Sequence, residues 1–292
     1  MRNRFSIILV GVPKVRDKMS KEETLLKQQL TVILKNTFDN YQEYDNFKLK
    51  IFAKELKSKH GEYFQNDRRI EIFNLSRSPG ANMLTAIHEL AHHVEAMDIG
   101  ETAHKQTFYE RFYQMICTAL KLGYIDEEDI QEDRKDSKDF ENVEKFFGLQ
   151  FLKDYKDDKI CNAVIVKKAY AFRKLLHRRD FSFLGESQSW GRIFETEEQA
   201  KNEMNILLSL DQSMEIELVP PTHLMFNQNY YISVEGAYEF KDKLRKSNFI
   251  WEGYGFKKRW VKKVPSSEYK ETMEYLKTLR LVGKKVVPIS TK

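Results

Sequence analysis

The stretch Ala86-Ile87-His88-Glu89-Leu90-Ala91-His92 carries the pattern H-E-x-x-H inside a segment with helical apolar periodicity. That periodicity predicts a helix from about residue 82 to residue 97. Two histidines four positions apart lie about 40° apart around a helix, so both imidazoles can reach one metal ion. The pattern therefore predicts a zinc-binding helix, with His88 and His92 as ligands and zinc as the cofactor.

The glutamate of this motif has a separate predicted role. Glu89 projects beside the metal, where it can take a proton from zinc-bound water, whose pKa is lowered to about 7. Zinc also polarises a carbonyl group, and the two effects together suit amide hydrolysis. We therefore expect Glu89 to be the catalytic base and a protein to be the substrate. The competing interpretation is a structural helix with surface histidines.

A catalytic zinc ion normally takes three protein ligands, and the third must come from outside the motif. The candidates that follow it are Glu95, Asp98, Glu101 and His104. Because Gly100 ends the first helix, a turn can fold a second helix, from about residue 103 to residue 122, back over the first. This helix would present His104 from its opening turn. His104 is the favoured third ligand and Glu101 is the second choice.

The segments around the motif predict a mixed α+β domain. Ser20 and Glu23 form a capping box at the start of a helix over residues 21–38. Short extended stretches follow at residues 47–53 and 69–75, and an apolar stretch at Phe5 to Val12 is predicted to be a buried strand. Residues 126–144 are so rich in charge that we expect a solvated helix or linker there.

Over roughly residues 20–125 the chain resembles the SprT-like family, which includes the Spartan proteases. The matching pieces are the helix at residues 21–38, the strand at residues 69–75, the motif at residues 86–92, and His104-Lys105-Gln106-Thr107-Phe108. The resemblance implies a zincin-like domain with a single zinc ion, His88, His92 and His104 as ligands, and Glu89 as general base. It also implies that proteins bound to DNA are possible substrates.

The second half of the chain contains an internal repeat with an offset of 68 residues. The matching positions are Ala169-Tyr170, Phe172, Leu176, Phe181 and Gly185 in the first copy, and Ala237-Tyr238, Phe240, Leu244, Phe249 and Gly253 in the second. Each copy reads as strand, helix, aromatic hairpin and helix; the alternative is chance similarity. The predicted fold class is therefore α+β, with a zincin-like domain at 1–155 and two tandem small α/β repeat units at 156–225 and 226–292.

Positive charge is concentrated at the C-terminal end. Residues 231–292 hold 15 basic and 7 acidic side chains, whereas residues 1–160 hold 26 and 28. In the second copy, aromatic residues interleave with basic ones. The aromatic residues are Phe249, Trp251, Tyr254, Phe256 and Trp260, and the basic ones are Lys257, Lys258, Arg259, Lys262 and Lys263. Stacking faces and positive charge suit contact with DNA or another polyanion. The alternative is that the aromatics form the core of the unit under a solvated basic face.

The composition limits the classes of protein that remain. Cys117 and Cys161 are the only cysteines, so neither a disulfide framework nor a zinc ribbon is available. The absence of a disulfide framework predicts a cytoplasmic protein. No apolar run approaches the roughly 20 residues that cross a bilayer, so we expect no membrane partner. The leading function is a zinc metallopeptidase targeted to nucleic-acid-associated proteins by its basic C-terminal region. The alternatives are a mobile-element regulatory or anti-defence protein that cleaves one repressor, or one that binds a partner without catalysis.

Overall fold

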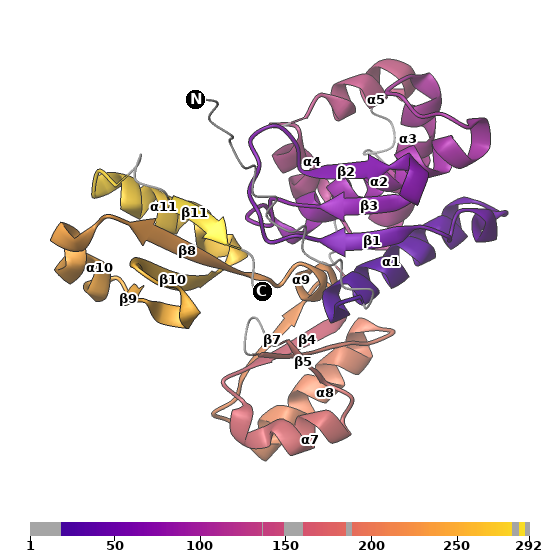
Figure 1. The fold of residues 1–292 in the computed structure, drawn as a ribbon. Coiled ribbons are helices and arrows are strands. Elements are labelled where there is room, and N and C mark those ends of the chain that lie inside the picture. Colours follow the sequence, from indigo (N-terminus) through magenta and orange to yellow (C-terminus); the bar gives the residue numbers. More distant parts are fainter. Residues whose placement is uncertain (1–18, 136, 149–159, 185–188, 282–285, 290–292) are drawn as a thin grey trace, which may run out of the picture.

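The computed structural model describes residues 19–135, 137–148, 160–184, 189–281 and 286–289 of a mixed α+β chain. Its strands form three small sheets, with the orders β1-β3-β2, β5-β6-β4-β7 and β11-β8-β10-β9. Figure 1 shows the three sheets in three separate parts of the molecule. The strand expected at Phe5 to Val12 lies outside the described residues.

The N-terminal part packs helices against the first sheet (Figure 1). Helix α1 (Lys21–Thr37) begins at Ser20, and the predicted capping box with Glu23 is confirmed. Strand β1 (Lys48–Ile51) runs parallel to β3 (Arg69–Ile72), and β2 (Gly61–Phe64) pairs with β3 in the antiparallel direction. The core beneath includes Leu26, Leu30, Ile70, Ile72, Leu84 and Ile87.

Helix α2 (Pro79–Ile99) carries the H-E-x-x-H motif and begins earlier than predicted. The Ser78 hydroxyl accepts a hydrogen bond from the Ala81 N–H, and Pro79 occupies the first helical position, where its missing N–H has no cost. Ser78 and Pro79 therefore start the helix about one turn before the apolar periodicity begins. Gly100 ends it in the left-handed conformation, at φ 79°, as predicted.

The charged stretch after helix α3 (Gln106–Lys121) is not the solvated helix or linker that its composition predicts. It forms two helices, α4 (Glu127–Asp133) and α5 (Asp139–Phe147). Ile130, Phe140 and Val143 are fully buried in the N-terminal core, so a few well-placed apolar residues fix both helices. Helix α4 also packs closely on α2: a Cβ atom on Gly80 would lie 1.9 Å from a carboxylate oxygen of Asp129.

The rest of the chain forms two units, each with one of the other two sheets, and the elements of both units follow the same order. The first contains β4 (Ala163–Lys167), α7 (Arg173–Arg178), β5 (Ser182–Leu184), β6 (Ser189–Ile193), α8 (Glu197–Leu210) and β7 (Glu215–Val219). The second contains β8 (Asn229–Glu235), α10 (Lys241–Lys246), β9 (Ile250–Trp251), β10 (Arg259–Pro265), α11 (Tyr269–Thr278) and β11 (Val286–Ile289). In each sheet the first strand lies between the third and the fourth, which is the split βαβ arrangement. The final strand of each unit is additional to the predicted pattern.

The backbone of the two units also corresponds at individual residues. Lys168 and Gly236 both have positive φ, at 53° and 63°. Asp180 and Asn248 likewise have φ values of 60° and 64°. Each pair is separated by the 68 residues of the sequence repeat, so unusual local conformations recur at equivalent positions.

Helix α9 (Thr222–Met225) joins the two units and packs against α1 and α2. Beyond it, Tyr230 of β8 is fully buried against the N-terminal part. Its hydroxyl accepts a hydrogen bond from the Leu75 N–H at 2.9 Å and donates one to Glu55 at 2.5 Å. The second unit is thus anchored directly to the part that contains the motif. Among the described helices, none combines the length and apolar character needed to span a membrane.

Candidate metal centre

Three histidine side chains converge at one point of the N-terminal part. The Nε2 atoms of His88 and His92 are 3.2 Å apart, and that of His104 lies 3.0 Å and 3.2 Å from them. These are the three ligands expected from the sequence, and the structure brings them together. They form one group that could hold a metal ion.

His104 reaches this group from a different position than predicted. It lies in the connection between α2 and α3, two residues before α3 begins at Gln106, and not in the helix's opening turn. The left-handed turn at Gly100 reverses the chain and returns this connection to the motif. Glu101, the second choice, is exposed and faces Lys105 at 3.8 Å instead of joining the group.

Phe108 forms a wall beside the three imidazoles. Its ring is fully buried, with its centroid 4.9 Å, 4.3 Å and 4.8 Å from those of His88, His92 and His104. Phe108 belongs to α3 and to the N-terminal core, so its ring also anchors this helix. It also gives the histidines an apolar neighbour that limits their freedom to rotate.

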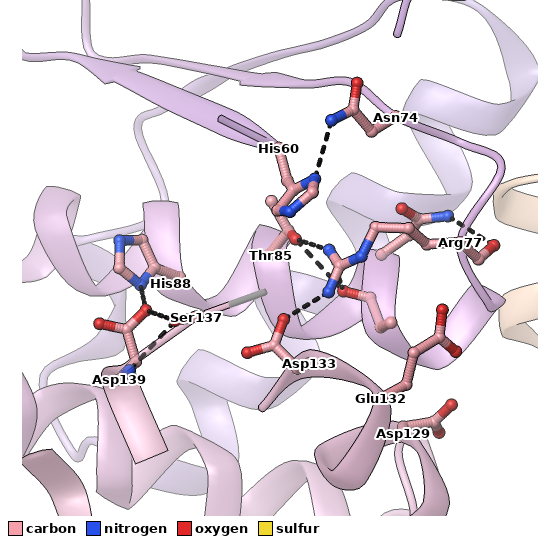
Figure 2. A network of polar contacts seen from close by, with 12 residues as sticks. His60, Asn74, Arg77, Thr85, His88, Asp129, Glu132, Asp133, Ser137 and Asp139 are labelled. Atoms are coloured by element: carbon pink, nitrogen blue, oxygen red, sulfur yellow. Dashed lines mark hydrogen bonds and ion pairs between the residues drawn. The ribbon is translucent and has the colours of Figure 1, made fainter. Parts of the chain in front are cut away.

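Asp139 orients the first histidine, as Figure 2 shows. Its carboxylate lies 3.0 Å from Nδ1 of His88, and it accepts further hydrogen bonds from the hydroxyls of Ser137 and Tyr109. Burial opposes both charges of the pair, but their hydrogen bond and attraction raise the pKa of His88 and lower that of Asp139. The sequence does not predict Asp139 as part of the site, because the charge of its region is typical of a solvated segment.

The second histidine is oriented through a hydroxyl group. Nδ1 of His92 lies 2.7 Å from the Thr102 hydroxyl, which in turn donates to the Glu95 carboxylate at 2.8 Å. Glu95 is buried and also accepts hydrogen bonds from the Ala103 N–H and the Thr107 hydroxyl. One carboxylate therefore fixes both the orientation of His92 and the connection that carries His104.

These partners decide which ring nitrogens carry protons. Thr102 uses its single hydroxyl proton on Glu95, so it accepts a hydrogen bond from Nδ1–H of His92. Burial and the neighbouring His88 and His104 lower the pKa of His92 to about 2, which leaves its Nε2 unprotonated. In a tetrahedral zinc site with Zn–N bonds of about 2.0–2.1 Å, the ligand nitrogens lie roughly 3.3 Å apart. The observed spacing and the available lone pair fit such a cation.

Glu89 lies in the same cleft and is almost fully buried, with 6% of its surface exposed. Burial raises its pKa to about 7, although the attraction of His88 and a hydrogen bond from the Tyr63 backbone oppose the rise. Strand β2 passes close by: a Cβ atom on Gly61 would lie 2.8 Å from Oε1 and Cγ of Glu89. A carboxyl group with this pKa can both accept and release a proton near neutral pH.

The cleft around these groups has a volume of about 620 Å³. Strand β2 and the residues just before it form one wall, and the helices α3 and α5 contribute to another. Tyr109 and Asn142 lie in this second wall, where the Asn142 amide donates to the Tyr109 hydroxyl at 2.8 Å. Burial raises the pKa of Tyr109 to about 12, so its hydroxyl keeps its proton and remains a hydrogen-bond donor.

The predicted basic residues lie far from this cleft along the chain, in and after the loop between β9 and β10. Lys257 and Lys258 are exposed, whereas Lys262 and Lys263 are half-buried on β10. Arg259 forms an ion pair with Glu235 at 2.6 Å, so part of the predicted charge is balanced within the unit. Of the interleaved aromatics, Phe249 and Trp260 belong to the core, while Trp251 and Tyr254 are exposed.

Comparisons of the chain with protein-family models, curated proteins and solved structures give no significant match.

Proposed function

We propose that this protein is a zinc-dependent metallopeptidase of the SprT-like kind, with His88, His92 and His104 as the zinc ligands. The observation that carries the proposal is the convergence of their three Nε2 atoms in a cleft that also contains Glu89. The oriented Nδ1 atoms of His88 and His92 support it, because metal-binding histidines usually hydrogen-bond a second group through the other ring nitrogen.

A zinc ion in this site supplies Lewis acidity and lowers the pKa of a coordinated water to about 7. Glu89 acts as the general base that accepts the proton of the attacking water and delivers it to the leaving amine. Its burial and its pKa of about 7 suit both steps. Asp139 and Thr102 hold the ligand imidazoles in place, and Phe108 keeps water from their apolar side.

An extended peptide is the substrate that best fits the cleft. Strand β2 lines it and is the edge strand of its sheet, paired with β3 alone among the described strands. The outer edge of such a strand offers backbone N–H and C=O groups to a peptide in extended conformation. A peptide bound along β2 lies beside Glu89, because Gly61 of this strand is in close approach to the Glu89 side chain.

We further propose that the two C-terminal units arose by duplication and that the second delivers the enzyme to nucleic-acid-associated proteins. The shared strand order and the recurring positive φ values at an offset of 68 residues support the duplication. The excess of basic residues in 231–292 supports an anionic partner.

Glu89→Gln is the variant that tests the peptidase proposal. It keeps the size and polarity of the side chain but removes the base, so zinc content should stay near one ion per chain while cleavage falls by several orders of magnitude. Digestion of DNA-bound and DNA-free basic proteins, followed by gel electrophoresis, measures cleavage and its dependence on DNA. If the Glu89→Gln variant keeps the full effect of the wild-type protein in cells, cleavage is not what the protein does. That result would contradict the proposal and favour a protein that acts by binding alone.

A further inference from the structure

Equivalent faces of the two C-terminal sheets have different surroundings. In the first sheet, the face opposite helices α7 and α8 buries Ala163 and Ile165 together with Leu224 of α9 and Leu25 of α1. Gly191 permits this close packing, because a Cβ atom there would lie 2.7 Å from the Leu224 side chain. This face of the first unit is therefore a docking surface within the chain.

The same face of the second sheet has a different composition. Tyr231 and Ser233 occupy the positions that correspond to Ala163 and Ile165, and they pair with Lys263 and Val261 of β10. The side chains of β8 that alternate with them, Tyr230, Ile232 and Val234, are the ones that join the core. Where the first unit has an apolar internal contact, the second therefore has tyrosine and lysine beside a buried serine and valine. We call this surface, with the loop over it, the second-sheet face.

The second-sheet face is covered by its own β9–β10 loop. The ring of Tyr231 lies 5.1 Å from that of Tyr254 and 5.9 Å from that of Phe256. Tyr254 remains 50% exposed above this cluster, so its ring is available to a ligand. Residues Glu252, Tyr254 and Lys258 have positive φ values of 52°, 57° and 57°. Non-glycine residues in this conformation carry strain, which is often retained where a loop has a binding role.

Basic residues lie on the same loop as Tyr254 and on the strand that follows it. The ammonium group of Lys263 lies 5.8 Å from the centroid of Tyr231, and Lys257 and Lys258 are exposed on the loop that carries Tyr254. Among the ion pairs of the described residues, none involves Lys257 or Lys258. Aromatic faces with adjacent lysines match the chemistry of unpaired bases and their phosphates, whereas a duplex keeps its base faces stacked inside.

We propose that the second-sheet face binds single-stranded nucleic acid, with a base stacked on Tyr254 and phosphates near Lys257, Lys258 and Lys263. This deepens the proposed delivery to a nucleic acid but does not depend on peptidase activity. The first unit has lost or never gained this role, because its equivalent face is occupied by α1 and α9. The same face of the duplicated fold thus packs against the N-terminal part in the first unit and binds a ligand in the second.

Fluorescence anisotropy with a labelled oligo-dT strand and a labelled duplex of equal length tests this inference. The full chain carrying Glu89→Gln is used, so that binding is measured without cleavage and apart from the peptidase proposal. We expect Tyr254→Leu to weaken single-strand binding about tenfold, since it removes one stacking face. Lys257→Gln with Lys258→Gln should weaken it and reduce the slope of affinity against salt concentration.

The matched control is Tyr238→Leu with Lys241→Gln. This pair is also an exposed tyrosine with a nearby lysine, 5.1 Å from its ring, in the same unit. It lies at the start of α10, with Tyr238 just before the helix and Lys241 as its first residue, and not on the β9–β10 loop. It should leave affinity unchanged. Three results would overturn the proposal: no single-strand binding by the parent chain, equal or tighter binding of the duplex, or unchanged affinity in both the tyrosine and the lysine variants. The lysines are exposed, so loss of folding does not explain an effect of the lysine variant.

Discussion

The carboxylate of Asp139 and the imidazole of His88 lie 3.0 Å apart on two different helices, α5 and α2. This contact makes the charged stretch after α3 part of the candidate metal centre. Ser137 and Tyr109 hold the same carboxylate through hydrogen bonds, so its position is fixed by the loop before α5 and by α3 as well.

Asp139→Asn should weaken zinc binding while leaving the fold intact. Asparagine has the same shape, but it lacks the negative charge that attracts the His88 imidazole. Loss of such an outer partner typically costs about 10–100-fold in metal affinity. Competition with a chelating dye measures the change, and Asp242→Asn, at an exposed position of α10, is the control. Equal zinc affinity in the two variants would remove Asp139 from the centre.

The zinc content of the protein should depend on the three histidines of the metal centre and not on other histidines of the chain. The protein should hold about one zinc ion per chain, and His88→Ala or His92→Ala should abolish binding. His104→Ala should weaken it far more than Glu101→Ala, because Glu101 is exposed and outside the group. His177→Ala, at an exposed position of α7, should retain full zinc content in elemental analysis. The reverse order of His104 and Glu101 would contradict the assignment.

Glu95 should act on the metal through its neighbours. Glu95→Gln replaces one acceptor oxygen by an NH₂ group. Because the Thr102 hydroxyl and the Ala103 N–H donate to one oxygen and the Thr107 hydroxyl to the other, the NH₂ group faces at least one donor in either orientation. The connection that carries His104 should loosen, so zinc should dissociate faster and the unfolding temperature should fall. Glu101→Gln is the matched control on the same connection. An unchanged zinc off-rate in Glu95→Gln would show that the connection is held by other contacts.

The sequence predicts those parts of the site that depend on local patterns. The helix around His88 and His92, its end at Gly100 and the burial of Phe108 follow from periodicity, the left-handed preference of glycine and apolar character. Asp139 could not be predicted in this way, because its proximity to His88 depends on how α5 packs against α3. The same holds for Glu95, whose partners follow from the path of the connection after Gly100.

The second-sheet face shows a similar limit. The repeat in the sequence predicts two similar units, but not that one sheet face meets α1 and α9 while the other carries Tyr254. Even the interleaved aromatics divide in a way that composition does not reveal. Phe249 and Trp260 are buried, whereas Trp251 and Tyr254 are exposed. Trp251 is paired with Trp260 and lies on the same face, but it belongs to the edge strand β9, which has a neighbour on one side only.

Gly61→Ala should impair cleavage without removing zinc. The new Cβ atom would lie 2.8 Å from atoms of the Glu89 and Thr85 side chains, so the Glu89 carboxyl group or strand β2 must shift. Misplacement of a catalytic group by about 1 Å can cost about 100-fold in rate. Ser58→Ala introduces a residue of the same kind at an exposed position of the same cleft and should keep most activity. Equal activities of the two variants would mean that Glu89 needs no such placement.

Glu89 should also make the stability of the metal-stripped protein depend on pH. Its pKa is about 7 in the folded chain, against a usual value of 4.5, so the unfolded chain loses this proton first as pH rises. The folded state is then favoured least above pH 7, and the stability lost between pH 4.5 and 7 amounts to about 3 kcal/mol. Glu89→Gln cannot ionise and escapes this loss. In urea unfolding with a chelator present, the variant should therefore gain stability over wild type as pH rises from 5 to 8.

Glu101→Gln, whose side chain is exposed, is the control and should show a constant difference in stability from wild type across this range. A constant difference for Glu89→Gln as well would mean that the buried carboxyl group titrates normally, and its fitness as a base near neutral pH would lose its physical support.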